Sequence, residues 1–198
     1  MLKLTKHQVE IRSRTNFEVI SGYIWRCVCK VRVEGNWNQP TRLTTLVNCR
    51  NRLNPPLPKN YFGYPLCYVV GKVREAIEKV NNEYVRSVLD YVENQKDMNW
   101  LRDKFYNFAR RNGQFGGDPN FCVYSWTNFP FYETYYGWGK PDCLAPGFVN
   151  SDSIGKAFVI DEGNGDGFVI SVCLQPFHID ALKKLFYEDM EMITSFKL

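Results

Sequence analysis

The spacing of apolar and polar residues along this chain predicts a protein built from both helices and strands. Apolar residues recur at three- and four-residue steps over residues 17–30, after Thr15 and Asn16, which can cap a helix. The same spacing over residues 72–94 predicts one long helix. Its expected apolar stripe is Ile77, Val80, Tyr84, Val88 and Tyr91. Further helices are expected near residues 98–111 and from Pro176, the latter with Ile179, Leu182, Leu185 and Phe186 facing inward.

Shorter segments rich in β-branched and aromatic residues predict strands between these helices. They cover Arg42–Val47, Phe121–Thr127, Lys156–Ile160 and Gly167–Leu174. The turn at residues 161–166 contains a Gly-Asn-Gly-Asp run, which predicts a hairpin. A phosphate-binding loop would open a helix here, and a calcium-binding loop would continue to a glutamate at its twelfth position; neither follows. We therefore expect an α/β fold, a mixed sheet with flanking helices.

Composition and charge narrow the possible partners. The chain has 198 residues, of which 44% are hydrophobic, so it is long enough for one ordinary core or two small ones, and a single globular unit is the default expectation. The net charge of +4 is spread along the chain without a basic stripe, and we expect no nucleic-acid partner. No stretch approaches the ~20 apolar residues of a membrane span, and we expect no membrane partner.

The cysteines and histidines predict neither a disulfide framework nor a metal site. Seven cysteines are scattered, and Cys27 and Cys29 point to different faces of the expected helix. The odd count and the start of the chain, which lacks the apolar core of a signal peptide, favour a reducing, cytoplasmic location. The two histidines are far apart. His178 is expected to be a surface residue at a helix start, and Leu182 stands where an aspartate would complete a His-x-x-x-Asp motif. His7, followed by Ile11, also lacks this motif.

Two sequence landmarks resemble one enzyme family. The first is the run from Val47 to Pro58, with Arg50 and Arg52, followed by Tyr61-Phe62-Gly63; the second is the run from Tyr135 to Pro141. Together they resemble the plant BAHD acyltransferases, and in particular their hydroxycinnamoyl transferases. The resemblance implies the C-terminal half of a chloramphenicol acetyltransferase-like fold. It also implies that residues 1–40 are a remnant of the N-terminal half and that residues 41–198 form the C-terminal domain.

The resemblance implies acyl transfer from a coenzyme A thioester to a small alcohol or amine, without a further cofactor. Such enzymes use the histidine of a His-x-x-x-Asp motif as the base, and that motif belongs to the half without a counterpart here, so we expect no catalytic residue in this chain. Trp126, Asn128 and Trp138 are expected to line the acyl or acceptor channel. Asn128 stands where family members that use shikimate carry an arginine, and the overall pattern is closer to the spermidine hydroxycinnamoyl transferases.

The guanidinium group of arginine can form two parallel hydrogen bonds to phosphate oxygens, and coenzyme A carries three phosphate groups. Arg50 and Arg52 are therefore candidates for binding coenzyme A, and the alternative is a structural ion pair. In the family, the aspartate of an Asp-Phe-Gly-Trp-Gly signature pairs with an arginine of this region. Here Tyr135 and Tyr136 replace the first two signature residues, while Gly137, Trp138 and Gly139 are retained. Loss of the carboxylate would leave a buried arginine without its partner, which costs roughly 3–5 kcal/mol.

A second departure from the family is an internal deletion. The segment Pro65–Ile77, which resembles the lead into a helix, follows Gly63 almost directly, and one strand of the family pattern is missing. A missing strand would leave its neighbour with an unpaired edge. We therefore expect a shortened acyltransferase with little or no turnover of its own. The alternative is a non-catalytic paralogue, or a gene-model fragment, that binds coenzyme A esters or a partner acyltransferase. The oligomeric state is left open.

Overall fold

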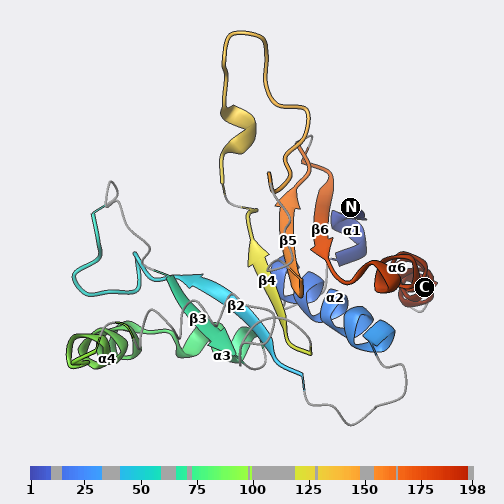
Figure 1. The fold of residues 1–198 in the computed structure, drawn as a ribbon. Coiled ribbons are helices and arrows are strands. Elements are labelled where there is room, and N and C mark those ends of the chain that lie inside the picture. The colour runs from blue at the N-terminus through green and yellow to red at the C-terminus, as the bar shows by residue number, and fades with distance from the viewer. Residues whose placement is uncertain are drawn as a thin grey trace.

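The structure, a computed structural model, describes residues 1–9, 15–32, 41–58, 66–70, 73–97, 99, 119–127, 129–147, 154–163 and 165–195. Its elements, labelled in Figure 1, are β1 (Leu2–Thr5), α1 (Lys6–Val9), α2 (Asn16–Arg32), β2 (Leu43–Asn48), β3 (Leu66–Val70), α3 (Val73–Lys79), α4 (Asn82–Glu93), β4 (Phe121–Ser125), the 3₁₀ helix η1 (Phe131–Glu133), β5 (Lys156–Asp161), β6 (Gly167–Cys173) and α6 (Pro176–Ser195). The helix expected near residues 98–111 lies outside the described residues, except for Asn99. The junction at Gly63 and the residue Asn128 also lie outside them.

Six strands form one mixed sheet in the order β1-β6-β5-β4-β2-β3. β4 runs parallel to its neighbours β2 and β5, and the other pairs are antiparallel. The predicted mixed α/β fold is confirmed. The predicted hairpin is confirmed as well: β5 and β6 pair along their length, and Glu162 N–H donates to the Gly167 carbonyl at 2.9 Å. Gly165 closes this turn at φ +80°, a conformation that favours glycine.

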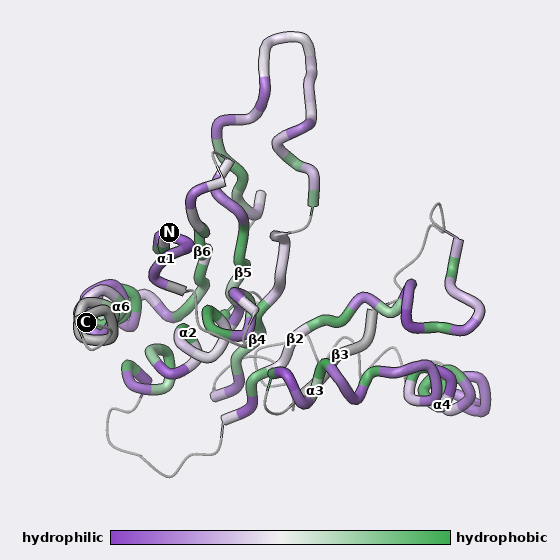
Figure 2. The backbone as a smooth tube through the Cα atoms, turned by 180° about the vertical axis from the view of Figure 1, so that it is seen from behind, coloured by the Kyte–Doolittle hydropathy of each residue, from purple (hydrophilic) through white to green (hydrophobic). Residues whose placement is uncertain are grey.

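One face of the sheet carries the main hydrophobic core, and α2 and α6 pack on that face (Figure 1). Alternate strand residues point into the core, as Leu2 and Leu4 do from β1 and Ala157 and Val159 from β5. Figure 2 shows hydrophobic colour along much of β5, a central strand of the sheet. The inward stripe predicted for the last helix is confirmed, because Leu182 and Phe186 are buried and Ile179 and Leu185 pack beside them. In the part of the chain that is described, no helix is both long and apolar enough to cross a membrane.

Helix α2 begins at the cap that its sequence predicts, and an ion pair that was not predicted anchors it. Thr15 Oγ1 accepts from the Glu18 main-chain N–H at 3.3 Å, while the Glu18 carboxylate accepts from the Thr15 N–H at 3.0 Å, which is a reciprocal cap. Further along, Lys30 Nζ lies 2.6 Å from a carboxylate oxygen of Asp189, a buried residue of α6. This ion pair ties the first long helix to the last one.

The described part of the first 40 residues, residues 1–9 and 15–32, belongs to the same core as the rest of the described chain. β1 pairs with β6 over four residues, and the Tyr23 hydroxyl of α2 donates to the Phe186 carbonyl of α6. The separate origin expected for residues 1–40 stays a prediction, but within the described residues this segment has no core of its own.

The single helix predicted over residues 72–94 is wrong: two helices, α3 and α4, meet at Val80 and Asn81. Asn81 is extended, and its side-chain oxygen accepts from the Tyr84 N–H at 2.8 Å, so it starts a new helix. The predicted apolar stripe also fails beyond this break. Val80 is fully buried, but Tyr84, Val88 and Tyr91 are exposed, because α4 lies at the periphery of the fold (Figure 1) and buries only Val85.

Replacing Asn81 by alanine removes the side-chain cap of α4. We expect a loss of about 1 kcal/mol in the free energy of unfolding, the usual cost of losing an N-cap. Chemical denaturation of the variant measures this loss. Asn51→Ala, at an exposed site on the loop after β2, is the matched control. Equal stability of the two variants would show that the capping bond contributes nothing.

The segment expected to lead into a helix does so, because α3 begins at Val73, but its first part forms strand β3, which was not predicted. Residues Leu66–Val70 pair antiparallel with β2, in a register that sets Asn48 opposite Leu66. β2 is therefore paired on both sides, with β3 and β4, and the unpaired edge lies on β3. This strand was not predicted because it depends on pairing with β2, which lies earlier in the chain, and not on a local turn signal.

Candidate functional site

The retained signature lies on a loop that projects from one end of the sheet. Residues 129–147, here called the arm, leave the sheet after β4 and extend away from it (Figure 1). Trp138 is 86% exposed and stacks on Tyr136 with ring centroids 6.0 Å apart. Gly137 and Gly139 adopt φ values of +102° and +125°, which side-chain-bearing residues rarely adopt, so the backbone itself explains why both positions are glycine.

Tyr135 does not take the place of a buried carboxylate. It is 67% exposed, and its hydroxyl donates to the Gly137 carbonyl at 3.2 Å within the same loop. An exposed phenol that bonds locally requires no cationic partner. The structure therefore shows no buried arginine facing Tyr135 among the described residues, and the expected penalty for losing an ion pair does not arise there.

The two arginines of the first landmark have different surroundings. Arg52 donates from Nη1 to the carbonyls of Ile77 and Val80, at 2.7 Å each, and so binds the C-terminal end of α3. Its contact is structural but is not an ion pair. Arg50 is half-buried, with Nη1 3.3 Å from the Asn48 side-chain oxygen. The role of Arg50 in binding coenzyme A stays a prediction.

Trp126 lies at the point where β4 passes into the arm. Its main-chain N–H donates to the Val159 carbonyl at 2.8 Å, which continues the pairing with β5. The indole packs against Phe158 and Phe131, with ring centroids 4.8 and 5.9 Å away. The ring is half-buried on the face of the sheet opposite α2 and α6.

The structure does not bring the predicted residues together at one point. β2 pairs with β4 only from Leu43 to Thr45 and then diverges with β3, which carries the loop with Arg50 and Arg52 away. Figures 1 and 2 show this loop and the arm far apart on the molecule. Trp126 lies at the base of the arm and Trp138 on the arm itself, without a ring contact between them among the described residues, and the two arginines lie in another part of the molecule.

His178 is buried, which corrects the expectation of a surface residue. It is 8% exposed in the first turn of α6, its ring lies 4.2 Å from that of Phe177, and its Nδ1 has no hydrogen-bond partner among the described residues. Burial results from the docking of α6 on the sheet. Because β6 runs from the hairpin to α6, His178 lies about 20 Å from the end that carries the arm, at ~3.3 Å per residue. His7 is exposed.

The cysteines of the sheet are poor candidates for catalytic nucleophiles. Cys122 and Cys173 flank Lys156 across β4, β5 and β6. Burial raises the pKa of the Cys122 thiol to about 11 and also raises the pKa of the Cys173 thiol, although Lys156 opposes both shifts. Both groups are therefore protonated near neutral pH.

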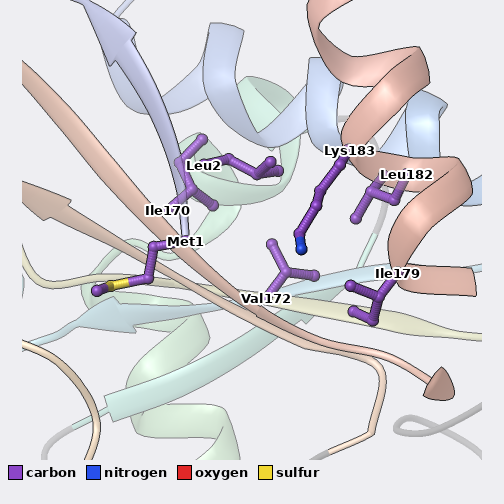
Figure 3. A pocket seen from close by; sticks show the side chains of 7 residues that line it. All are labelled: Met1, Leu2, Ile170, Val172, Ile179, Leu182 and Lys183. Carbon is purple, nitrogen blue, oxygen red and sulfur yellow. The ribbon is translucent and has the colours of Figure 1, made fainter.

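A cavity lies on the core face, between β1, β6 and α6 (Figure 3). Its volume is about 50 Å³, enough for one or a few water molecules but not for an aromatic acyl group. Its lining is Met1, Leu2, Ile170, Val172, Ile179, Leu182 and Lys183. The side chains are almost all apolar, and the cavity lies on the opposite face from Trp126. We assign it to packing, not to substrate.

Comparison with known proteins decides the family. The model of the Transferase family matches residues 2–189. The chain belongs to this family, that of the BAHD acyltransferases. The hydroxycinnamoyl-CoA:piscidic acid hydroxycinnamoyltransferase of Actaea racemosa is 33% identical over 96% of this chain and 49% of its own length. Hydroxycinnamoyltransferase 1 of Oryza sativa subsp. japonica is 33% identical over 88% of the chain and 41% of its own length.

The fold agrees with this membership. The crystal structure of vinorine synthase superposes with a TM-score of 0.62 at 18% identity, over 90% of this chain and 44% of that one. The BAHD fold predicted from the landmarks is confirmed. The chain spans about half the length of the curated relatives it matches.

Proposed function

We propose that this chain contributes the acyl-CoA side of a hydroxycinnamoyl transfer reaction, from a coenzyme A thioester to an alcohol or amine. Membership of the BAHD family supports acyl transfer as the chemistry. The names of the related enzymes, which transfer hydroxycinnamoyl groups, favour that acyl group for this chain. The observation that carries the proposal is the retained Gly137-Trp138-Gly139 signature on an arm that leaves the sheet beside Trp126.

In this proposal the residues act by binding and placement. Trp126 and Trp138 offer ring surfaces to the substrates, and Arg50 offers a guanidinium that suits a phosphate of coenzyme A. Arg52 holds the loop against α3 and so positions Arg50. The acceptor is an amine or alcohol without the carboxylate of shikimate, because Asn128 replaces the arginine that would bind it.

Deprotonation of the acceptor is the step that these 198 residues do not supply. His178 lies at the far end of the sheet from the arm, and His7 lacks an aspartate at the required spacing. General-base assistance contributes about 10²- to 10⁴-fold to such reactions. The same observation favours the second candidate function, a non-catalytic protein that binds coenzyme A esters or a partner acyltransferase.

We expect the pure chain to bind 4-coumaroyl-CoA and to form product from spermidine or shikimate at least about 100-fold more slowly than a full-length relative. Calorimetric titration measures binding, and mass spectrometry of the reaction mixture measures product. Turnover close to that of the full-length enzyme would contradict the role assigned to the missing base. Absence of binding to any coenzyme A ester would contradict the proposed function itself.

A further inference from the structure

Five aromatic side chains form an unbroken row from the sheet to the base of the arm. Tyr124 and Phe158 are cross-strand neighbours on β4 and β5, stacked with centroids 5.0 Å apart and planes 17° from parallel. Phe158 contacts Trp126 at 4.8 Å, Trp126 contacts Phe131 at 5.9 Å, and Phe131 contacts Phe129 at 5.2 Å. Each ring therefore touches the next.

This ring row does not belong to the core of the protein. The strand residues of the core alternate with Tyr124 and Phe158, which places the two rings on the opposite face from α2 and α6. None of the five side chains is part of either hydrophobic cluster of the described residues. Tyr124, Phe158, Trp126 and Phe131 are half-buried, and Phe129 is 55% exposed. The packing of the core consequently does not explain the row.

We propose that the ring row is a binding surface for the planar phenolic ring of a substrate. Aromatic rings prefer offset-stacked or edge-to-face contacts at centroid distances of about 4.5–7 Å, and the rings of the row, which are only partly buried, keep ring surface for such contacts with a further ring. Its exposed end at Phe129 and its half-buried end at Tyr124 let a flat ring enter from solvent and lose water on binding. An aliphatic group of similar size gains the apolar contact but not the ring geometry.

Such a ring has two sources in the proposed reaction, the hydroxycinnamoyl group of the donor or an aromatic acceptor. The assignment of source rests on the proposed function, whereas the recognition of a ring does not. Two pairs of probes separate the sources: 4-coumaroyl-CoA with butyryl-CoA, and tyramine with butylamine. Within each pair the charged part is kept, and a short saturated alkyl chain replaces the phenolic ring and its linker.

Calorimetric titration of the full chain with the four probes tests the inference. In at least one pair we expect the ring-bearing probe to bind about five- to tenfold more tightly, and Phe158→Leu to abolish that preference. Phe177→Leu makes the same chemical change at an exposed ring at the start of α6 and is expected to keep the preference. The pair that shows the effect identifies the source of the ring.

The absence of a ring preference in both pairs, or a preference that Phe158→Leu leaves intact, would overturn the inference. Thermal melts establish that the variants fold, and Phe131→Leu, which lies in η1 outside the sheet, replaces Phe158→Leu if the latter does not fold. If neither coenzyme A ester binds but tyramine binds better than butylamine, the proposed function fails and the ring surface stands.

Discussion

Phe186→Ala is expected to lower the free energy of unfolding by about 3–5 kcal/mol, the usual cost of deleting a fully buried phenylalanine ring. Phe186 has no exposed surface and lies at the contact of α6 with α2, where its ring is 5.0 Å from that of Tyr23. Removing the ring leaves a cavity that the packed helices cannot close. Because domains are stable by only about 5–15 kcal/mol, this loss is a large share of the total stability, and the variant is expected to unfold at a clearly lower denaturant concentration.

Urea denaturation followed by circular dichroism measures this effect, and the next residue is its control. Tyr187 is 44% exposed, and its ring packs edge-on against Phe186. Tyr187→Ala removes a side chain of similar size from the same helix, and we expect a loss below about 1.5 kcal/mol. Similar losses for the two variants would mean that α6 is not docked on the sheet through Phe186.

Arg52→Met is expected to cost about 2–3 kcal/mol, because it removes two charged hydrogen bonds and leaves the last carbonyls of α3 without this donor. Methionine keeps most of the apolar stem of the arginine, so lost packing contributes little. The loop after β2 is expected to loosen with it, since Arg52 holds that loop against the helix. Chemical denaturation measures the stability of the variant.

Asn51→Ala, at an exposed site of the same loop, is the control. We expect it to change the free energy of unfolding by no more than about 0.5 kcal/mol. An Arg52 variant as stable as the Asn51 variant would contradict the structural role of Arg52. In that case Arg52 would again be a candidate for binding phosphate.

Elements with local signals were predictable from the sequence. The cap at Thr15 and the apolar spacing after it predict α2, and the Gly-Asn-Gly-Asp turn predicts the β5–β6 hairpin, because neighbouring residues determine both. The break before α4 is also local, since Asn81 is an N-cap residue. The apolar period continues through it, however, and that period alone predicts one helix.

Features that depend on distant partners were not predictable in the same way. The burial of His178 follows from how α6 packs, and strand β3 follows from its pairing with β2. The ring row needs the register that sets Tyr124 beside Phe158, 34 positions later in the chain by their numbers. The sequence did contain one signal, the alternation of aromatic residues at positions 124 and 126. Of these two residues, only Trp126 was predicted to line a channel.

The pairing of the first long helix with the last one also has a consequence for biosynthesis. Tyr23 and Phe186 are 163 residues apart in sequence, so the apolar side of α2 stays without the cover of α6 until the residues between them have been synthesised. Until then that side is available to chaperones or to other nascent chains. Contacts between segments so far apart in sequence also slow folding.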